Sequence, residues 1–268
     1  MLEPTVLLTP DQITFFQQQG YLALPAITTP EEIDAILGVY DRLFEQGAGR
    51  AEGDNIDLGG AGDGSTGAVL PQIMGPSKYA PELAATQYYA NALAIARQLL
   101  GADATFDGDH AIRKPPRSGV ETPWHQDEAY SDPRYLHESI SIWMPLQEAT
   151  LENGCMQFLP GSNQQDVVEH HSMGHDPRVE ALEADNVDVS QAVVCPLPPG
   201  GATIHHCRTL HYTGPNLSDA PRRAYILQFG VPATRRETPR DYHWNRIKRT
   251  AWVERQKELG NKAYDIDD

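Results

Sequence analysis

The sequence predicts a mainly β protein with helical cladding, whose strands form a double-stranded β-helix, the jelly-roll barrel of cupin-like proteins. Two observations favour this fold class. Helical patterns occupy roughly the first hundred residues, and short strands separated by turn residues follow from residue 105. The 268 residues show no internal repeat and no linker. We therefore expect one domain over 1–268, with N-terminal helices at about 9–100, the barrel at about 105–232, and a C-terminal helix and tail at 233–268.

Two capping signals support the predicted N-terminal helices. Thr9 is followed by Pro10 and then by Gln12, which is the order of a helix N-cap, a proline in the first turn and a capping-box partner. Gly20 is expected to end that helix. The pattern of an N-cap followed by proline recurs at Thr29, where a second helix should begin.

Between the helices and the barrel, the sequence predicts three further segments. Residues 21–24 have the pattern of a short strand, and residues 80–100 that of a third helix. The glycine- and aspartate-rich segment 47–67 is expected to be a loop. Such a loop is either a plain surface connection or a lid that closes over substrate.

The barrel strands are recognised by alternation and by the turns between them. Isoleucine and methionine alternate with serine and tryptophan from Ser139 to Leu146, as in a half-buried strand. Asn153 and Gly154 form a hairpin-turn signal before the next strand. The other expected elements are strands at 155–159, 202–206 and 224–231 and a C-terminal helix at 250–259.

One histidine and one aspartate have the spacing of a metal-binding pair. His125 and Asp127 are two residues apart, so on a strand both side chains point to the same face. Such a pair, together with one distant histidine, makes the facial triad of non-haem iron(II) oxygenases. By position in the chain, His205, His206 and His211 all qualify as that second histidine.

An arginine downstream of these histidines is suited to bind a carboxylate. Arg222 follows His211 by eleven residues and stands at the start of a predicted strand. A guanidinium can grip the distal carboxylate of 2-oxoglutarate with two parallel hydrogen bonds. From composition alone, Arg113, Arg208 and Arg223 could serve the same purpose.

Several segments, taken in order, resemble the phytanoyl-CoA dioxygenase family of iron(II)/2-oxoglutarate-dependent oxygenases. The resemblance extends over about residues 9–232 and includes the opening helix with its Gly-Tyr end. Each segment alone is weakly specific, and the combination is highly specific. The matching segments are WHQD at 124–127, WMPL at 143–146, ENG at 152–154, LPGS at 159–162 and LHYTGPN at 210–216, which runs into PRR at 221–223.

This resemblance implies a role for seven residues. Related halogenases carry a small residue in place of the carboxylate ligand, so the aspartate here argues for hydroxylation or a related oxidation. The implied ligands of Fe(2+) are His125, Asp127 and His211; the implied contacts of 2-oxoglutarate are Arg222, Thr213, Trp143 and His110.

The remaining histidines and arginines have ordinary structural interpretations. His205 and His206 are adjacent, so only one of them can face inward from a strand, and either is expected to be packed or at the surface. Arg223 should point away from Arg222 and be solvated or salt-bridged. The polar stretch with His170, His171 and His175 is expected to be a surface loop.

Three aromatic residues and one cysteine complete the set of candidates. Trp124, Tyr130 and Tyr135 are each expected either to line a substrate pocket or simply to pack in the interior. Cys207 has no evident base beside it, so we expect an inert, buried thiol.

The family resemblance implies an oxygenase that uses O2 and 2-oxoglutarate as co-substrates, releases succinate and CO2, and hydroxylates a small organic molecule. The alternative is a non-oxidative, metal-binding cupin-like protein, such as an isomerase or a sensor. Thr213 and Arg222 separate the two hypotheses, because a protein without 2-oxoglutarate has no need of a carboxylate clamp.

Overall fold

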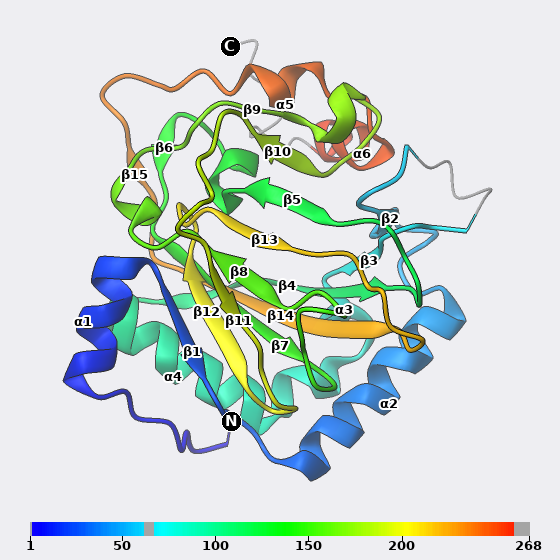
Figure 1. Ribbon diagram of the computed structural model, residues 1–268, viewed down its shortest axis with the longest axis vertical. Coiled ribbons are helices and arrows are strands. Elements are labelled where there is room, and N and C mark those ends of the chain that lie inside the picture. The colour runs from blue at the N-terminus through cyan, green and yellow to red at the C-terminus, as the bar shows by residue number, and fades with distance from the viewer. Residues whose placement is uncertain (1, 62–66, 260–268) are drawn as a thin grey trace.

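A computed structural model describes residues 2–61 and 67–259 of the chain (Figure 1). Helices lie mostly in the N-terminal part and again near the C-terminus, and strands fill the centre. The α-helices are α1 (Pro10–Gln19), α2 (Pro30–Gln46), α3 (Pro76–Tyr79), α4 (Gln87–Leu100), α5 (His243–Ile247) and α6 (Ala251–Glu258). The short 3-10 helices are η1 (Pro81–Ala85), η2 (Asp127–Tyr130), η3 (Ser162–Gln164) and η4 (Met173–His175).

Two antiparallel sheets form the centre of the fold, as the jelly-roll prediction requires. The larger sheet has the order β1 (Tyr21–Leu24), β12 (Ala202–His206), β7 (Ser139–Pro145), β14 (Arg222–Gly230), β4 (Thr105–Lys114), β3 (Pro71–Met74) and β2 (Asn55–Asp57). The smaller sheet has the order β11 (Val193–Cys195), β8 (Met156–Phe158), β13 (His211–Thr213) and β5 (Thr122–His125). Two ribbons pair β10 (Leu182–Ala184) with β9 (His170–Ser172), and β15 (Thr234–Arg235) with β6 (Tyr135–Leu136).

The predicted N-terminal helices are confirmed by their caps. The side chain of Thr9 accepts a hydrogen bond from the backbone of Gln12, and the reciprocal bond of the capping box is also present. Gly20 ends α1 with a φ of 79°, a left-handed conformation that glycine adopts without strain. Thr29 caps α2, with its side chain accepting a hydrogen bond from the backbone of Glu32. The third helix is interrupted, because Thr86 ends η1 and provides the N-cap of α4.

Strand β7 shows why the larger sheet has a helical layer on one side and a cavity on the other. Ile140, Ile142 and Met144 point into the main hydrophobic core, where α4 packs across β14, β7 and β4. Ser141 and Trp143 point to the opposite face and line the cavity. The expectation of a half-buried strand was therefore wrong, since the polar face is turned towards a cavity and is buried as well.

The glycine-rich segment 47–67 is partly ordered into the larger sheet. Residues Asn55–Asp57 form β2 and pair with β3, and Ile56 and Leu58 line the cavity. Residues 62–66 lie outside the described part of the chain. The hypothesis of a lid stays a prediction.

The C-terminal helix is present close to its predicted position. The Thr250 side chain accepts a hydrogen bond from the backbone of Val253 and caps α6. Trp252, the second residue of this helix, lines the cavity. In the part of the chain that the structure describes, no helix has the length and apolar character needed to cross a membrane.

Candidate functional site

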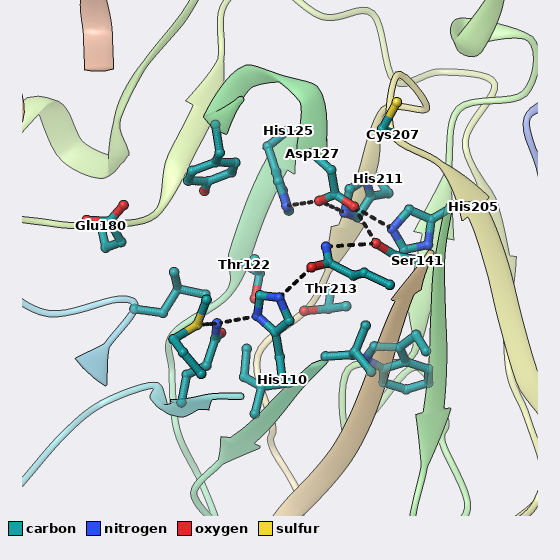
Figure 2. Close-up of a pocket in the computed structure, with 18 of the residues that line it drawn as sticks. His110, Thr122, His125, Asp127, Ser141, Glu180, His205, Cys207, His211 and Thr213 are labelled. Atoms are coloured by element: carbon teal, nitrogen blue, oxygen red, sulfur yellow. Dashed lines mark hydrogen bonds and ion pairs between the residues drawn. The ribbon is translucent and has the colours of Figure 1, made fainter. Parts of the chain in front are cut away.

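The candidate site is a cavity of about 330 Å³ whose lining residues come from both sheets (Figure 2). The smaller sheet contributes His125 and His211, which are directly opposite each other in the β5–β13 pairing. This register brings the two imidazole rings to a centroid distance of 4.1 Å. Residues 86 apart in the chain are thus placed side by side by one strand pairing.

Asp127 completes a cluster that could hold a metal ion. One ligand atom from each of His125, Asp127 and His211 lies within 4.8 Å of the other two. The Oδ1 atom of Asp127 is 3.7 Å from His125 Nε2 and 3.5 Å from His211 Nε2. Two imidazoles and one carboxylate on one side of a cavity match the donor set of non-haem iron(II) oxygenases. No other group of this kind occurs among the described residues.

The backbone sets the tautomer of both histidines in this cluster. His125 Nδ1 is 2.7 Å from the carbonyl oxygen of Pro123, and His211 Nδ1 is 2.9 Å from that of Thr209. A carbonyl oxygen only accepts, so each Nδ1 carries the proton and donates it. Each Nε2 therefore directs a lone pair into the cavity, which is what a metal ligand requires.

Burial and the neighbouring histidines favour the ionisation states that a metal ion needs in all three side chains. Burial lowers the pKa of His125 from its usual value and lowers the pKa of His211 much further, so both rings are neutral. For Asp127, burial opposes ionisation, but the neighbouring imidazoles and the hydrogen bond from His205 lower the pKa of its carboxyl well below the usual range. The carboxylate is therefore ionised.

The structure corrects the local conformation that the spacing predicted. Of the pair His125 and Asp127, only His125 lies on a strand, at the end of β5. Asp127 is the first residue of η2. The two side chains still converge, since the turn of η2 brings the carboxylate back towards the imidazole. The i, i+2 argument thus named two side chains that do converge, but placed one of them on an incorrect element.

His170 is not in a surface loop, as had been expected, but is buried on β9 with 1 % of its surface exposed. Its Nδ1 donates to the carbonyl oxygen of Val168 at 2.8 Å, so its Nε2 accepts from the backbone of Gln126 at 3.2 Å. Gln126 lies between the two candidate ligands His125 and Asp127. His170 therefore supports the turn that carries them.

The burial of His170 predicts a loss of stability in acid. Burial lowers the pKa of His170 from 6.5 to about 4, so below pH 6.5 the unfolded chain takes up a proton that the folded protein does not. The stabilisation that results from keeping this ring neutral is complete above pH 6.5 and is lost as the pH falls towards 4. Between pH 7 and 5 it amounts to about 2 kcal/mol. Urea unfolding at both pH values should show a steeper loss for the wild type than for His170→Phe, and equal losses would contradict this account.

The inner end of the cavity contains a buried guanidinium that has no acidic partner among the described residues. Arg222 is the first residue of β14 and only 1 % exposed. Its guanidinium carbon lies 5.4 Å from the ring centre of Trp143, and burial lowers the pKa of Arg222 to about 10. A buried lysine, Lys114, pairs with Arg222 in the β4–β14 register and donates to the carbonyl oxygens of Thr213 at 2.9 Å and Gly214 at 2.5 Å. Burial and the neighbouring Arg222 lower the pKa of Lys114 well below its usual range. An anionic ligand beside Arg222 would offset the cost of burying its positive charge.

Three polar atoms at this end have no partner within the described part of the chain. They are the Nε and Nη1 atoms of Arg222 and the hydroxyl of Thr213, all of them buried. Buried polar groups are nearly always hydrogen-bonded, so atoms of this kind indicate a ligand. The carboxylate of 2-oxoglutarate would supply acceptors for both side chains. The residues therefore fit this co-substrate.

The other arginines considered from composition lie elsewhere and have partners of their own. Arg223 Nε is 2.7 Å from Asp41 Oδ1, which confirms that this side chain is salt-bridged on the other face of β14. Arg113 lies over the ring of Phe44 at 4.6 Å. Arg208 bridges Glu128 at 3.0 Å and Glu138 at 2.6 Å. Arg222 is the one arginine among the described cavity-lining residues.

Not all of the remaining candidate residues line the cavity. His110 lines the cavity, and its two ring nitrogens lie 2.9 Å from Gln72 Nε2 and 2.7 Å from Gln228 Oε1. Tyr130 also lines the cavity, whereas Trp124 stacks on Tyr212 with ring centres 5.4 Å apart. Tyr135 pairs with Arg235 in the β6–β15 ribbon. Cys207 is buried, and burial raises the pKa of its thiol to about 12, which confirms the inert thiol.

Two cavity residues near the candidate metal cluster, Ser141 and Gln228, were not singled out from the sequence, and His205 was expected only to be packed or at the surface. Their strands β7, β14 and β12 are neighbours in the larger sheet. The alternation in β7 places Ser141 on the face opposite the isoleucines, and this pattern was the sequence signal that could have identified Ser141. No local pattern distinguished His205 from His206.

The sequence is similar to a known protein family and to individual proteins. A protein-family model described as phytanoyl-CoA dioxygenase (PhyH) matches residues 16–224. A probable alpha-ketoglutarate-dependent hypophosphite dioxygenase from Stutzerimonas stutzeri is 26 % identical over 220 residues, which cover 81 % of this chain and 76 % of that protein.

Solved structures show the same fold. EvdO2 from Micromonospora carbonacea var. aurantiaca, solved in complex with 2-oxoglutarate, is 38 % identical, covers 91 % of this chain and 99 % of its own, and superposes with a TM-score of 0.78. The non-heme alpha ketoglutarate-dependent carbocyclase SnoK from nogalamycin biosynthesis is 23 % identical, with coverages of 91 % and 93 % and a TM-score of 0.69.

Proposed function

Because the chain belongs to the phytanoyl-CoA dioxygenase family, we propose that it hydroxylates a small organic molecule with release of succinate and CO2. The protein is an iron- and 2-oxoglutarate-dependent oxygenase. Membership of this class argues against the alternative of a non-oxidative cupin-like isomerase or sensor.

In this proposal His125, Asp127 and His211 hold the iron through two Nε2 atoms and one carboxylate oxygen. Their tautomers and ionisation states, described above, support this assignment. Iron(II) bound with 2-oxoglutarate and O2 supplies the oxidising power. The protein provides the ligands, the orientation of both substrates and the cavity that holds them.

Arg222 and Thr213 bind the distal carboxylate of 2-oxoglutarate, and Trp143 covers the guanidinium. The observation that carries the proposal is the pair of unpartnered, buried groups on Arg222 and Thr213 within the described residues. A carboxylate between them would accept from the guanidinium in a two-pronged way and from the hydroxyl. Lys114 keeps the backbone of Thr213 in place. His110 stays a weaker candidate for the same pocket, because its ring nitrogens already have partners.

The remainder of the cavity is proposed to receive the substrate. The cavity lining is more apolar than polar, includes the acidic residues Asp107 and Glu180, and contains no lysine among the described residues. We therefore expect an uncharged or weakly charged organic molecule rather than a polyanion. The described lining residues of this part include Ile56, Leu58, Met74, Tyr130 and Trp252.

The experiment that tests the proposed function is succinate release from purified protein with iron(II), 2-oxoglutarate, O2 and a panel of small organic molecules. A true substrate should stimulate succinate release, and mass spectrometry should find one oxygen atom added for each succinate formed. The relative SnoK is named as a carbocyclase. Substrate-dependent succinate release without oxygen in the product would therefore replace hydroxylation by ring formation or a similar oxidation.

A further inference from the structure

The two oxygen atoms of Asp127 lie in different surroundings. Oδ1 is turned towards the imidazoles of His125 and His211. Oδ2 is 2.7 Å from the hydroxyl of Ser141 and 3.2 Å from Nε2 of His205 (Figure 2). Two donors thus hold one oxygen, and the other oxygen remains directed towards the two histidines.

His205 has the opposite tautomer from the two candidate ligands. Its Nδ1 is buried without a partner in the described part of the chain, and its Nε2 faces the carboxylate. The proton therefore belongs on Nε2, where it is donated to Asp127. His205 lies close to His211, with ring centres 4.2 Å apart. Even so, it directs an N–H rather than a lone pair towards the cluster, so it is not a fourth ligand.

The other donor, Ser141, is the last member of a chain of hydrogen bonds. Gln72 Nε2 donates to His110 Nδ1 at 2.9 Å, and His110 Nε2 donates to Gln228 Oε1 at 2.7 Å. Gln228 Nε2 then donates to Ser141 Oγ at 3.3 Å, so the serine proton is directed to Asp127. All four bonds run in the same direction, towards the negative charge, and such chains reinforce one another.

Strand register makes this arrangement rigid. His205 is paired with Ser141 between β12 and β7, and Ser141 is paired with Gln228 between β7 and β14. The three side chains form a row across the cavity face of the larger sheet, whereas the two histidine ligands come from the smaller sheet. The row therefore fixes the aspartate relative to both sheets.

We propose that His205 and Ser141 are positioning residues that hold Asp127 by Oδ2, so that the carboxylate binds iron through Oδ1 alone. This inference rests on the proposed ligand set His125, Asp127 and His211. Without the two donors the carboxylate could rotate or bind through both oxygens. Partners of this kind typically change metal affinity by roughly 10- to 100-fold when they are replaced.

The test is anaerobic titration of the purified full-length chain with Co²⁺, in which the visible absorption reports both affinity and coordination geometry. His205→Phe should weaken Co²⁺ binding roughly 10- to 100-fold and change the spectrum. His205→Gln should restore most of the affinity, since its amide can place an N–H near the position of Nε2. Ser141→Ala removes only a hydroxyl and should also weaken binding by about 10-fold.

His206 provides the matched control on the same strand. Its Nε2 is 3.0 Å from Glu138, away from the cluster, so His206→Phe and His206→Gln should bind Co²⁺ as the wild type does. Wild-type affinity in His205→Phe or Ser141→Ala would overturn the inference, as would equal losses in His205→Gln and His205→Phe. If His205→Phe does not fold, the Co²⁺ affinity of Ser141→Ala tests the inference by itself. A wild type that binds no Co²⁺, or a His125→Ala variant with normal affinity, would instead reject the proposed ligand set.

Discussion

Replacing Asp127 by alanine is expected to abolish substrate oxidation and to reduce iron affinity by more than about 100-fold. The variant loses one of the three proposed ligands and the negative charge of this cluster, which leaves two neutral imidazoles for a divalent cation. Replacing a residue that merely supports a ligand already costs roughly 10- to 100-fold, so loss of the ligand itself should cost more. Metal titration and succinate release under saturating iron(II) measure the two effects.

Asp185 provides a control for this variant, because it is an acidic residue outside the cluster. Its Oδ1 is 2.7 Å from His171 Nδ1 on the ribbon of β9 and β10. Asp185→Ala should retain metal binding and oxidation. Near-normal oxidation by Asp127→Ala would mean that the carboxylate ligand lies elsewhere in the chain.

Replacing Arg222 by alanine should weaken 2-oxoglutarate binding by roughly 30-fold or more, with iron affinity nearly unchanged. The distal carboxylate loses its water on binding and needs a buried charge partner in exchange. Removal of one partner from such a pair typically costs on the order of 2–5 kcal/mol. Isothermal titration with 2-oxoglutarate in the presence of Co²⁺ measures this loss.

Arg223 is the matched control for Arg222, because it is the next residue on β14 and points to the other face. Its side chain bridges Asp41 at 2.7 Å, so Arg223→Ala should lower protein stability slightly and leave 2-oxoglutarate affinity unchanged. Unchanged 2-oxoglutarate affinity in Arg222→Ala would show that the co-substrate carboxylate is bound by other residues.

Local features were predicted well wherever neighbouring residues decide the structure. The N-caps at Thr9 and Thr29 and the left-handed end at Gly20 need only side chains three or four residues away, and all three are confirmed. The opposite directions of Arg222 and Arg223 follow from strand alternation alone, and the burial of one and the salt bridge of the other agree with it. The single-domain organisation stays a prediction.

Features that depend on distant segments were predicted poorly. His170 was placed in a surface loop because its own neighbours are polar, yet β9 is buried beneath the C-terminal segment, where its ring lies 5.4 Å from that of Trp244. Asp127 was placed on a strand, although the pairing of β5 ends at His125. A few neighbouring residues carry no information about where the pairing with a distant strand ends.

The sequence by itself therefore determined the fold class, the family, and which residues are candidates for binding the metal and 2-oxoglutarate. Only the tertiary structure decided which candidates act together and how. His205 and His206 have the same side chain on adjacent positions of β12, and the register of β12 with β7 is what turns His205 towards Asp127 and His206 towards Glu138. That register pairs residues that are 60 or more positions apart in the chain. The physical reason is that strand pairing is set by the burial of whole sheet faces, to which a single residue contributes little.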